Sequence, residues 1–141
     1  MDCIFCKIIE GDIPSYKIYE DDVVYAFLDI TQATKGHTLI VPKKHVKNVY
    51  ELSDDLASEV FKRVPHIAKA LKKAFKPIGL NIINNNDQPH QSVFHFHIHL
   101  IPRYEDDGMT LSTINHQESL KNEDYIKIQK AIKTVMSVNN D

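Results

Sequence analysis

The sequence predicts an α+β fold in which a mostly antiparallel five-stranded sheet is covered by two main helices. Three observations predict it: short β-branched or aromatic runs recur along the chain, two longer stretches carry apolar residues at helical spacing, and no repeat or Gly/Ser linker divides them. The length of 141 residues suits one domain. We therefore predict a single domain over 1–141, with a C-terminal helical segment at about 122–138.

The predicted strands are apolar runs bounded by turn residues or proline. Asp21 and Asp22 separate the first two runs, and Gly36 and Pro42 bound the third. In chain order the five strands are expected at 17–20, 23–28, 37–41, 80–83 and 94–101.

The first predicted helix begins after Ser53, a good N-cap residue. Asp54 lies in its first turn, where a negative charge is stabilised by the positive end of the helix dipole. Pro65 should kink this helix and Pro77 should end it. One face packs on the sheet through Leu56, Val60, Val64, Ile67, Leu71 and Phe75. The second helix is predicted by the amphipathic spacing of Tyr125, Ile126, Ile128, Ile132, Val135 and Met136.

Charge and hydropathy exclude two classes of partner. With 17 Lys+Arg against 19 Asp+Glu, the chain lacks the basic excess of a polyanion binder, so no nucleic-acid partner is expected. Its apolar runs fall far short of the ~20 residues of a membrane-spanning helix. The N-terminus lacks the pattern of a signal peptide, and two cysteines without an export signal suggest a cytoplasmic location.

Three of the eight histidines lie within the segment 95–99. Side chains on a strand alternate between faces, so His95, His97 and His99 should share one face. The opposite, apolar face should carry Phe94, Phe96, Ile98 and Leu100. Three explanations compete: a polar face that happens to use histidine, a three-histidine metal site, and nucleophilic catalysis.

Geometry argues against one ion shared by all three histidines. The outer Cα atoms at this spacing lie about 13 Å apart on an extended strand. An imidazole places a metal only roughly 6 Å from its Cα, so the outer residues would have to reach one point in line rather than tetrahedrally. The roles of the three histidines should therefore divide.

A middle imidazole flanked by two others suits nucleophilic catalysis. The ordinary histidine pKa of about 6.5 leaves most of the side chain neutral, and therefore nucleophilic, at neutral pH. Neighbouring histidines disfavour several positive charges, which keeps at least one ring neutral. A flanking ring can instead carry a proton and stabilise charge that develops on a phosphate.

The histidine segment resembles the signature of the histidine-triad (HIT) family of nucleotide hydrolases and transferases, most closely its bacterial Hint-like branch. Further segments resemble the family in the expected order: 4–9 with Ile13-Pro14, 26–30, 35–45, 79–81 and 91–95. The resemblance implies a HIT-like fold and a homodimer in which two five-stranded sheets join. It also implies a purine nucleotide or nucleotide conjugate as ligand and no organic cofactor.

The resemblance implies hydrolysis at the α-phosphorus of purine nucleoside phosphoramidate-type substrates, through a nucleotidyl-histidine intermediate. One alternative is a dinucleoside polyphosphate hydrolase or a nucleotidyl transferase. A second alternative, from another class, is a nucleotide-binding interaction module.

The resemblance assigns the catalytic roles residue by residue. His97 is the nucleophile, His99 binds the phosphate, and the backbone carbonyl of His95 orients the His97 ring. Ser92 contacts the phosphate and the leaving atom, and His37 supports the array. Taken alone, His37 could equally be a structural histidine.

The remaining ligand contacts are also implied by the resemblance. Asp29 would accept the ribose hydroxyls, for which a short carboxylate is suited, although a turn or cap role is the alternative. Asn84 and Gln91 would lie on the phosphate side. An apolar slot for the base would be formed by Phe5, Ile8, Phe27 and Ile30, which could otherwise be ordinary core. One departure is His90, where Hint-like proteins usually have glycine.

Cys3 and Cys6 form a CxxC pair that allows three interpretations: a redox disulfide, two unlinked thiols, or half of a structural zinc site. A closed zinc site needs four ligands. By resemblance to bacterial triad proteins and related uridylyltransferases, the other two ligands are His45 and His95. We therefore predict a structural Zn²⁺ held by these four residues, with no open coordination position.

Overall fold

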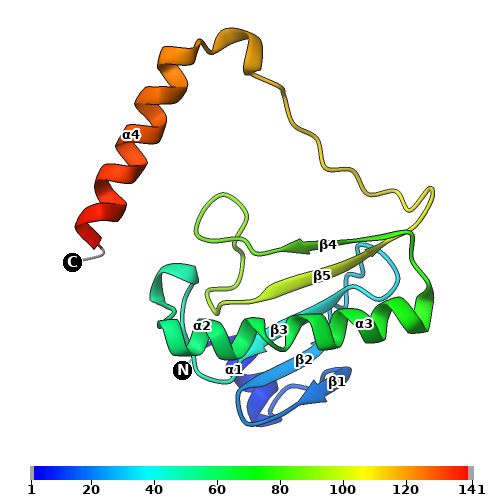
Figure 1. The fold of residues 1–141 in the computed structure, drawn as a ribbon. Helices are drawn as coiled ribbons and strands as arrows, with labels where there is room; N and C mark the ends of the chain where they lie inside the picture. Colours follow the sequence, from blue (N-terminus) through cyan, green and yellow to red (C-terminus); the bar gives the residue numbers. More distant parts are fainter. Residues whose placement is uncertain (1, 140–141) are drawn as a thin grey trace. The chain divides into compact units, whose positions relative to one another are not determined.

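The fold is described from a computed structural model covering residues 2–139 (Figure 1). Within this range, five strands form one antiparallel sheet in the order β1-β2-β3-β5-β4, which confirms the predicted α+β class. The strands are β1 (Lys17–Glu20), β2 (Val24–Leu28), β3 (Thr38–Pro42), β4 (Gly79–Ile83) and β5 (Ile98–Arg103). The predicted bounds are close except at β5, which begins at Ile98 rather than at 94.

The helices are α1 (Ile4–Glu10), α2 (Asp54–Phe61), α3 (Val64–Phe75) and α4 (Asn122–Asn139), with 3-10 turns η1 (Val49–Glu51) and η2 (Gln117–Ser119). Ser53 is the N-cap of α2, as predicted: its Oγ accepts a hydrogen bond from the Leu56 amide at 3.1 Å. The predicted kink at Pro65 is a complete break, because proline lies in the first turn of α3, where no N–H is needed. α1 was not predicted.

The chain divides into two compact units, the first ending at Met109 and the second beginning at Thr110. The second unit contains η2 and α4, which matches the helical segment predicted at about 122–138. Apolar side chains exposed on α4 are Tyr125, Ile126, Ile128, Ile132, Val135 and Met136. Among residues 2–139, no helix combines the length and apolar character that crossing a membrane requires.

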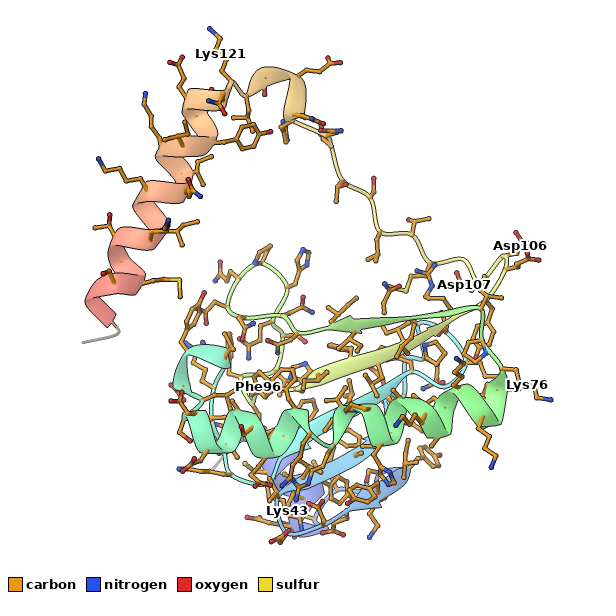
Figure 2. All side chains as sticks on the ribbon, in the orientation of Figure 1. Lys43, Lys76, Phe96, Asp106, Asp107 and Lys121 are labelled. Carbon is orange, nitrogen blue, oxygen red and sulfur yellow. The ribbon has the colours of Figure 1, made fainter. Side chains whose placement is uncertain are left out.

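Alternate residues of β2 pack into two apolar layers on opposite faces of the sheet. Val24 and Ala26 belong to the cluster that includes the buried face of α2 and α3, whereas Tyr25 and Phe27 belong to the cluster around α1. The ribbon shows α2 and α3 running along one face of the sheet (Figure 1). Phe96 is fully buried in the α2–α3 layer (Figure 2). The sheet therefore separates a structural layer from the layer that contains α1.

The histidine segment keeps the predicted alternation over most of its length. Phe96, Ile98 and Leu100 are fully buried in the α2–α3 layer. Phe94, however, is 46% exposed, contrary to the prediction. The reason is that the chain before Ile98 does not pair as a strand; instead, the Phe96 amide donates to the Val46 carbonyl at 2.7 Å.

Candidate active site and metal centre

α1 closes one side of a cavity of about 360 Å³. The helix is short but well defined: Phe5 and Ile8 are buried one turn apart, and Gly11 ends the helix in the left-handed conformation at φ 87°. Eight predicted residues line the cavity: Phe5, Ile8, Phe27, Asp29, Ile30, Ser92, His97 and His99. The cavity thus combines an apolar wall with a carboxylate, a hydroxyl and two imidazoles.

His97 is held as a neutral ring with one free lone pair. Its Nδ1 lies 2.7 Å from the backbone carbonyl of His95, so Nδ1 must carry the proton and donate. Burial lowers the pKa of His97, partly offset by this hydrogen bond. The proton on Nδ1 leaves Nε2 unprotonated, which is the form a nucleophilic imidazole needs.

His99 has the opposite tautomer, which is fixed by a chain of hydrogen bonds. The Ala33 amide donates to His37 Nδ1 at 3.1 Å, so the neutral His37 ring carries its proton on Nε2. His37 Nε2 lies 2.9 Å from His99 Nδ1 and donates to it. Burial lowers the pKa of His37, and burial also lowers the pKa of His99 to about 4. His99 is therefore neutral, with its own N–H on Nε2 as a donor.

Asp29 brings a negative charge to the same cavity. Its Oδ1 accepts hydrogen bonds from the amide of Thr31 at 2.9 Å and from its hydroxyl at 2.6 Å. Burial opposes ionisation, but these bonds and the nearby His37 lower the pKa of Asp29 overall. Oδ2 lies 3.6 Å from His37 Nε2. Asp29 therefore stabilises a turn and also lines the cavity, and its contact with ribose hydroxyls stays a prediction.

Cys3, Cys6, His45 and His95 come together beside this cavity, with their donor atoms within 4.8 Å of one another. Cys3 Sγ lies 3.4 Å from His95 Nδ1, and Cys6 Sγ lies 3.4 Å from His45 Nδ1. The two Nδ1 atoms are 3.2 Å apart. A zinc tetrahedron with Zn–N of ~2.0–2.1 Å and Zn–S of ~2.3 Å has edges of about 3.3–3.8 Å, so the four residues fit such an ion.

The protonation of His95 also fits a metal ligand. Its Nε2 lies 2.7 Å from the Pro42 carbonyl and must donate to it, so the Nδ1 lone pair faces the two sulfurs. Burial lowers the pKa of His95 to about 4, which keeps the ring neutral. Burial and the neighbouring Cys3 raise the pKa of Cys6 to about 11, so a cation bound there would displace the thiol proton.

Asn84 and Gln91 do not line the cavity but hold the backbone beside it. The Asn84 amide donates to the His97 carbonyl at 2.9 Å. Gln91 is buried, and its amide donates to the Lys47 and Val93 carbonyls at 2.7 and 3.1 Å. Their direct contact with substrate stays a prediction.

His90 is exposed and needs no left-handed backbone. The positive φ of this loop falls on Asp87, at 59°. A side chain at His90 is therefore compatible with the loop even though Hint-like proteins usually have glycine there.

Several residues that line the cavity were not predicted from the sequence. Further cavity-lining residues are Ile4, Ile13, Pro14, Ser15, Leu28, Thr31, Leu39 and Val93. The helical spacing of Phe5 and Ile8 before Gly11 was a usable signal for α1. No sequence signal identified the Ala33 amide or the Pro42 carbonyl, because backbone groups of any residue type can serve there.

Comparison with known proteins identifies a HIT domain at residues 10–106. The crystal structure of a HIT family member from Bacillus subtilis is 54% identical, covers 95% of this chain and 96% of its own, and superimposes with a TM-score of 0.92. Adenosine 5'-monophosphoramidase of Schizosaccharomyces pombe is 43% identical over 104 residues, covering 73% of this chain and 75% of its own. A Zn-bound histidine triad protein from Mycobacterium smegmatis is 32% identical, covers 93% and 98%, and has a TM-score of 0.73.

Proposed function

The chain belongs to the HIT family, and from that premise we propose that it hydrolyses purine nucleoside phosphoramidates at the α-phosphorus. The observation that carries the proposal is the pair of opposite tautomers in one cavity: His97 presents a lone pair and His99 presents an N–H. The similarity to adenosine 5'-monophosphoramidase supports the class of substrate.

In the proposed reaction, His97 Nε2 attacks the α-phosphorus and the bond to the leaving nitrogen breaks. A nucleotidyl-His97 intermediate forms, and the departing nitrogen takes up a proton from solvent, which is returned when water later attacks phosphorus. The His95 carbonyl, bonded to Nδ1–H at 2.7 Å, stabilises the positive charge that the ring acquires. His99 donates to a phosphate oxygen. Water then attacks phosphorus, releasing the nucleoside monophosphate and restoring neutral His97.

The apolar wall and the carboxylate would position the nucleoside. Phe5 and Phe27 contact each other edge to face, with ring centroids 5.5 Å apart, and can pack against a purine. Asp29 Oδ2 would accept ribose hydroxyls, since Oδ1 is occupied by Thr31. Ile30 is 83% exposed, so a bound base would cover it.

We propose that the four-residue cluster of Cys3, Cys6, His45 and His95 holds a structural zinc ion. Bound there, zinc would supply a cross-link between the N-terminal segment and the histidine segment, with no open position for chemistry. The Zn-bound relative from Mycobacterium smegmatis supports this assignment.

A second cavity of about 420 Å³ offers room for the leaving group. It shares Ile4, Ser92 and Val93 with the first cavity, so a molecule that spans both would pass Ser92. Phe94 also lines it and is 46% exposed. Because Asp2, Cys3 and His45 also line this cavity, its wall is mixed polar and apolar and does not select the leaving group by polarity alone.

The test compares turnover of an adenosine phosphoramidate with that of a diadenosine polyphosphate. We expect faster turnover of the phosphoramidate. Faster turnover of the diadenosine compound would instead support a dinucleoside polyphosphate hydrolase. Binding of both without turnover would indicate a nucleotide-binding interaction module.

The mechanism is tested separately with His97→Ala. We expect turnover to fall by about 10³-fold or more, because nothing replaces the nucleophile. His116→Ala is the matched control, since His116 is exposed in the second unit and should leave turnover unchanged. Rapidly quenched wild-type protein should carry labelled nucleotide. Full turnover by His97→Ala would refute the covalent mechanism.

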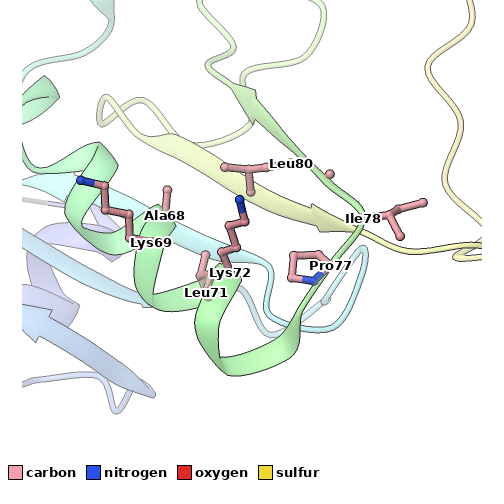
Figure 3. A pocket seen from close by; sticks show the side chains of 8 residues that line it. Ala68, Lys69, Leu71, Lys72, Pro77, Ile78 and Leu80 are labelled. Carbon is pink, nitrogen blue, oxygen red and sulfur yellow. The ribbon is translucent and has the colours of Figure 1, made fainter.

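We also propose a homodimer formed through β4. Among residues 2–139, this strand lies at one end of the sheet order, so no other described strand pairs with its outer edge. Ile82 on this strand is 53% exposed, and Ile78, directly before the strand, is 73% exposed and lies beside a hollow between α3 and β4 (Figure 3). Light scattering should give a molar mass twice that of one chain, and Ile82→Asp should lower this mass toward that of the monomer.

A further inference from the structure

α1 carries residues of both the metal cluster and the nucleotide cavity. Cys3 is its N-cap residue and Cys6 lies in its first turn; both belong to the metal cluster. Ile4, Phe5 and Ile8 line the nucleotide cavity. The six residues 3–8 therefore contain two of the four residues of the metal cluster and three residues of the wall of the nucleotide cavity.

Phe5 forms the direct contact between the two sites. It lies between the two cysteines in sequence, and its ring is 7% exposed. The Phe5 centroid is 6.0 Å from that of the ligand His95 and 5.0 Å from that of the nucleophile His97. A displacement of α1 would therefore change both the base slot and the packing of the catalytic imidazole.

α1 is too short to be stable by itself. Isolated helices of fewer than about 12 residues are marginal in water, so this helix depends on its tertiary contacts. At its N-terminus the cap is a sulfur, Cys3 Sγ, which accepts from the Cys6 amide at 3.4 Å. Sulfur is a weak acceptor, so this cap restrains the helix only weakly. Both cysteines also belong to the cluster with His45 and His95, where a bound cation would add a stronger restraint.

We propose that metal occupancy of the Cys3/Cys6/His45/His95 cluster controls affinity for nucleoside monophosphates by fixing α1 against the nucleotide cavity. This inference rests on the proposed nucleotide site. It gives the metal a role beyond general stability, because the element that the metal restrains is the same element that forms the base slot. Linkage then requires that nucleotide binding tighten metal binding by the same factor.

The experiment measures AMP binding by calorimetry to zinc-loaded protein and to chelator-treated protein. We expect zinc to lower the Kd for AMP roughly tenfold, within the range of ordinary coupling between two sites. Saturating AMP should strengthen zinc binding by the same factor. Hydrogen exchange should slow in residues 3–11 on adding zinc alone, with little change in β4.

The double variant Cys3→Ser/Cys6→Ser is the control, because added zinc should no longer alter its AMP affinity. If this variant fails to fold, AMP binding and hydrogen exchange of the wild-type protein with and without zinc still test the coupling. Equal AMP affinity with and without zinc would overturn the coupling alone. Absence of AMP binding to zinc-loaded protein would overturn the proposed function, and the coupling with it. Absence of zinc binding would overturn the coupling and leave the nucleotide site intact.

Discussion

Two side-chain clusters in this protein both gather metal-ligand types of residue, but their histidines are hydrogen-bonded differently. Cys3, Cys6, His45 and His95 form one, which we call the sulfur cluster; Asp29, His37 and His99 form the other, the carboxylate cluster. In both, the donor atoms lie within 4.8 Å of one another. Proximity of ligand-type residues therefore does not distinguish a metal site from a hydrogen-bonded site.

The difference lies in the partner of the second nitrogen of each histidine. His95 donates Nε2–H to the Pro42 carbonyl, so its Nδ1 lone pair is available to a metal. His37 accepts from the Ala33 amide on Nδ1, so its proton lies on Nε2, toward His99 and Asp29. The His37–His99 separation of 2.9 Å is also a hydrogen-bond length, shorter than a zinc tetrahedron edge of about 3.3 Å. The Pro42 carbonyl thus leaves the Nδ1 lone pair of His95 available to a metal, whereas the Ala33 amide places the proton of His37 on the nitrogen that faces His99 and Asp29.

The largest expected effect comes from breaking the sulfur cluster. His45→Ala should lose bound zinc and reduce the free energy of unfolding by about 4 kcal/mol, the stabilisation given by a ligand at a thousand times its Kd. Metal analysis and chemical denaturation measure the two quantities. His66→Ala is the matched control, since His66 is exposed and outside both clusters. Unchanged stability after loss of zinc would show that the fold does not depend on the ion.

The second-largest expected effect comes from disrupting the carboxylate cluster. His37→Ala removes the donor that fixes the tautomer of His99, and kcat should fall about 30-fold, as for other outer hydrogen-bonding partners. KM should change little and zinc content should not change. His37→Gln, which can still donate to His99, should recover part of kcat. Loss of zinc in His37→Ala would mean that the carboxylate cluster also binds metal.

The sequence predicted the parts of both clusters that depend on local periodicity. Alternation of faces placed Phe96 and Ile98 in the core. The spacing of the three histidines along an extended strand led to the expectation that their roles divide. The structure places His95 in the sulfur cluster and His97 and His99 at the cavity, while the roles themselves stay a prediction.

Contacts that depend on tertiary structure could not be predicted in the same way. The His37–His99 bond joins residues 62 apart in sequence, and it exists only because β3 pairs with β5. The bond from His95 to Pro42 joins residues 53 apart and ends on a backbone carbonyl, which has no residue signature. The cytoplasmic location remains a prediction.

A third test uses the low pKa of His99, which is about 4 because of burial. The unfolded chain protonates this group near 6.5, so stability is full above about pH 6.5 and falls as the pH drops toward 4. After allowing for partial solvent screening, the loss from His99 is roughly 1–2 kcal/mol. Denaturation of wild-type and His99→Gln protein at several pH values should show a shallower acid-side slope for the variant. Equal slopes would mean that His99 is not buried as a neutral ring.

The smallest expected effect separates the ligand role of Asp29 from its role in the turn. Asp29→Asn keeps an oxygen that can accept from the Thr31 amide and hydroxyl, so the turn should remain, while the negative charge beside His37 is lost. We expect AMP affinity to fall about five- to tenfold, or about 1 kcal/mol, the usual contribution of one hydrogen bond. Zinc content should not change, because the sulfur cluster shares no residue with this one. Calorimetry with 2'-deoxy-AMP supplies the decisive comparison: if Asp29 accepts the ribose hydroxyl, the variant should lose much less affinity for the deoxynucleotide than for AMP. Equal losses for both nucleotides would show that Asp29 acts through His37 and the turn instead.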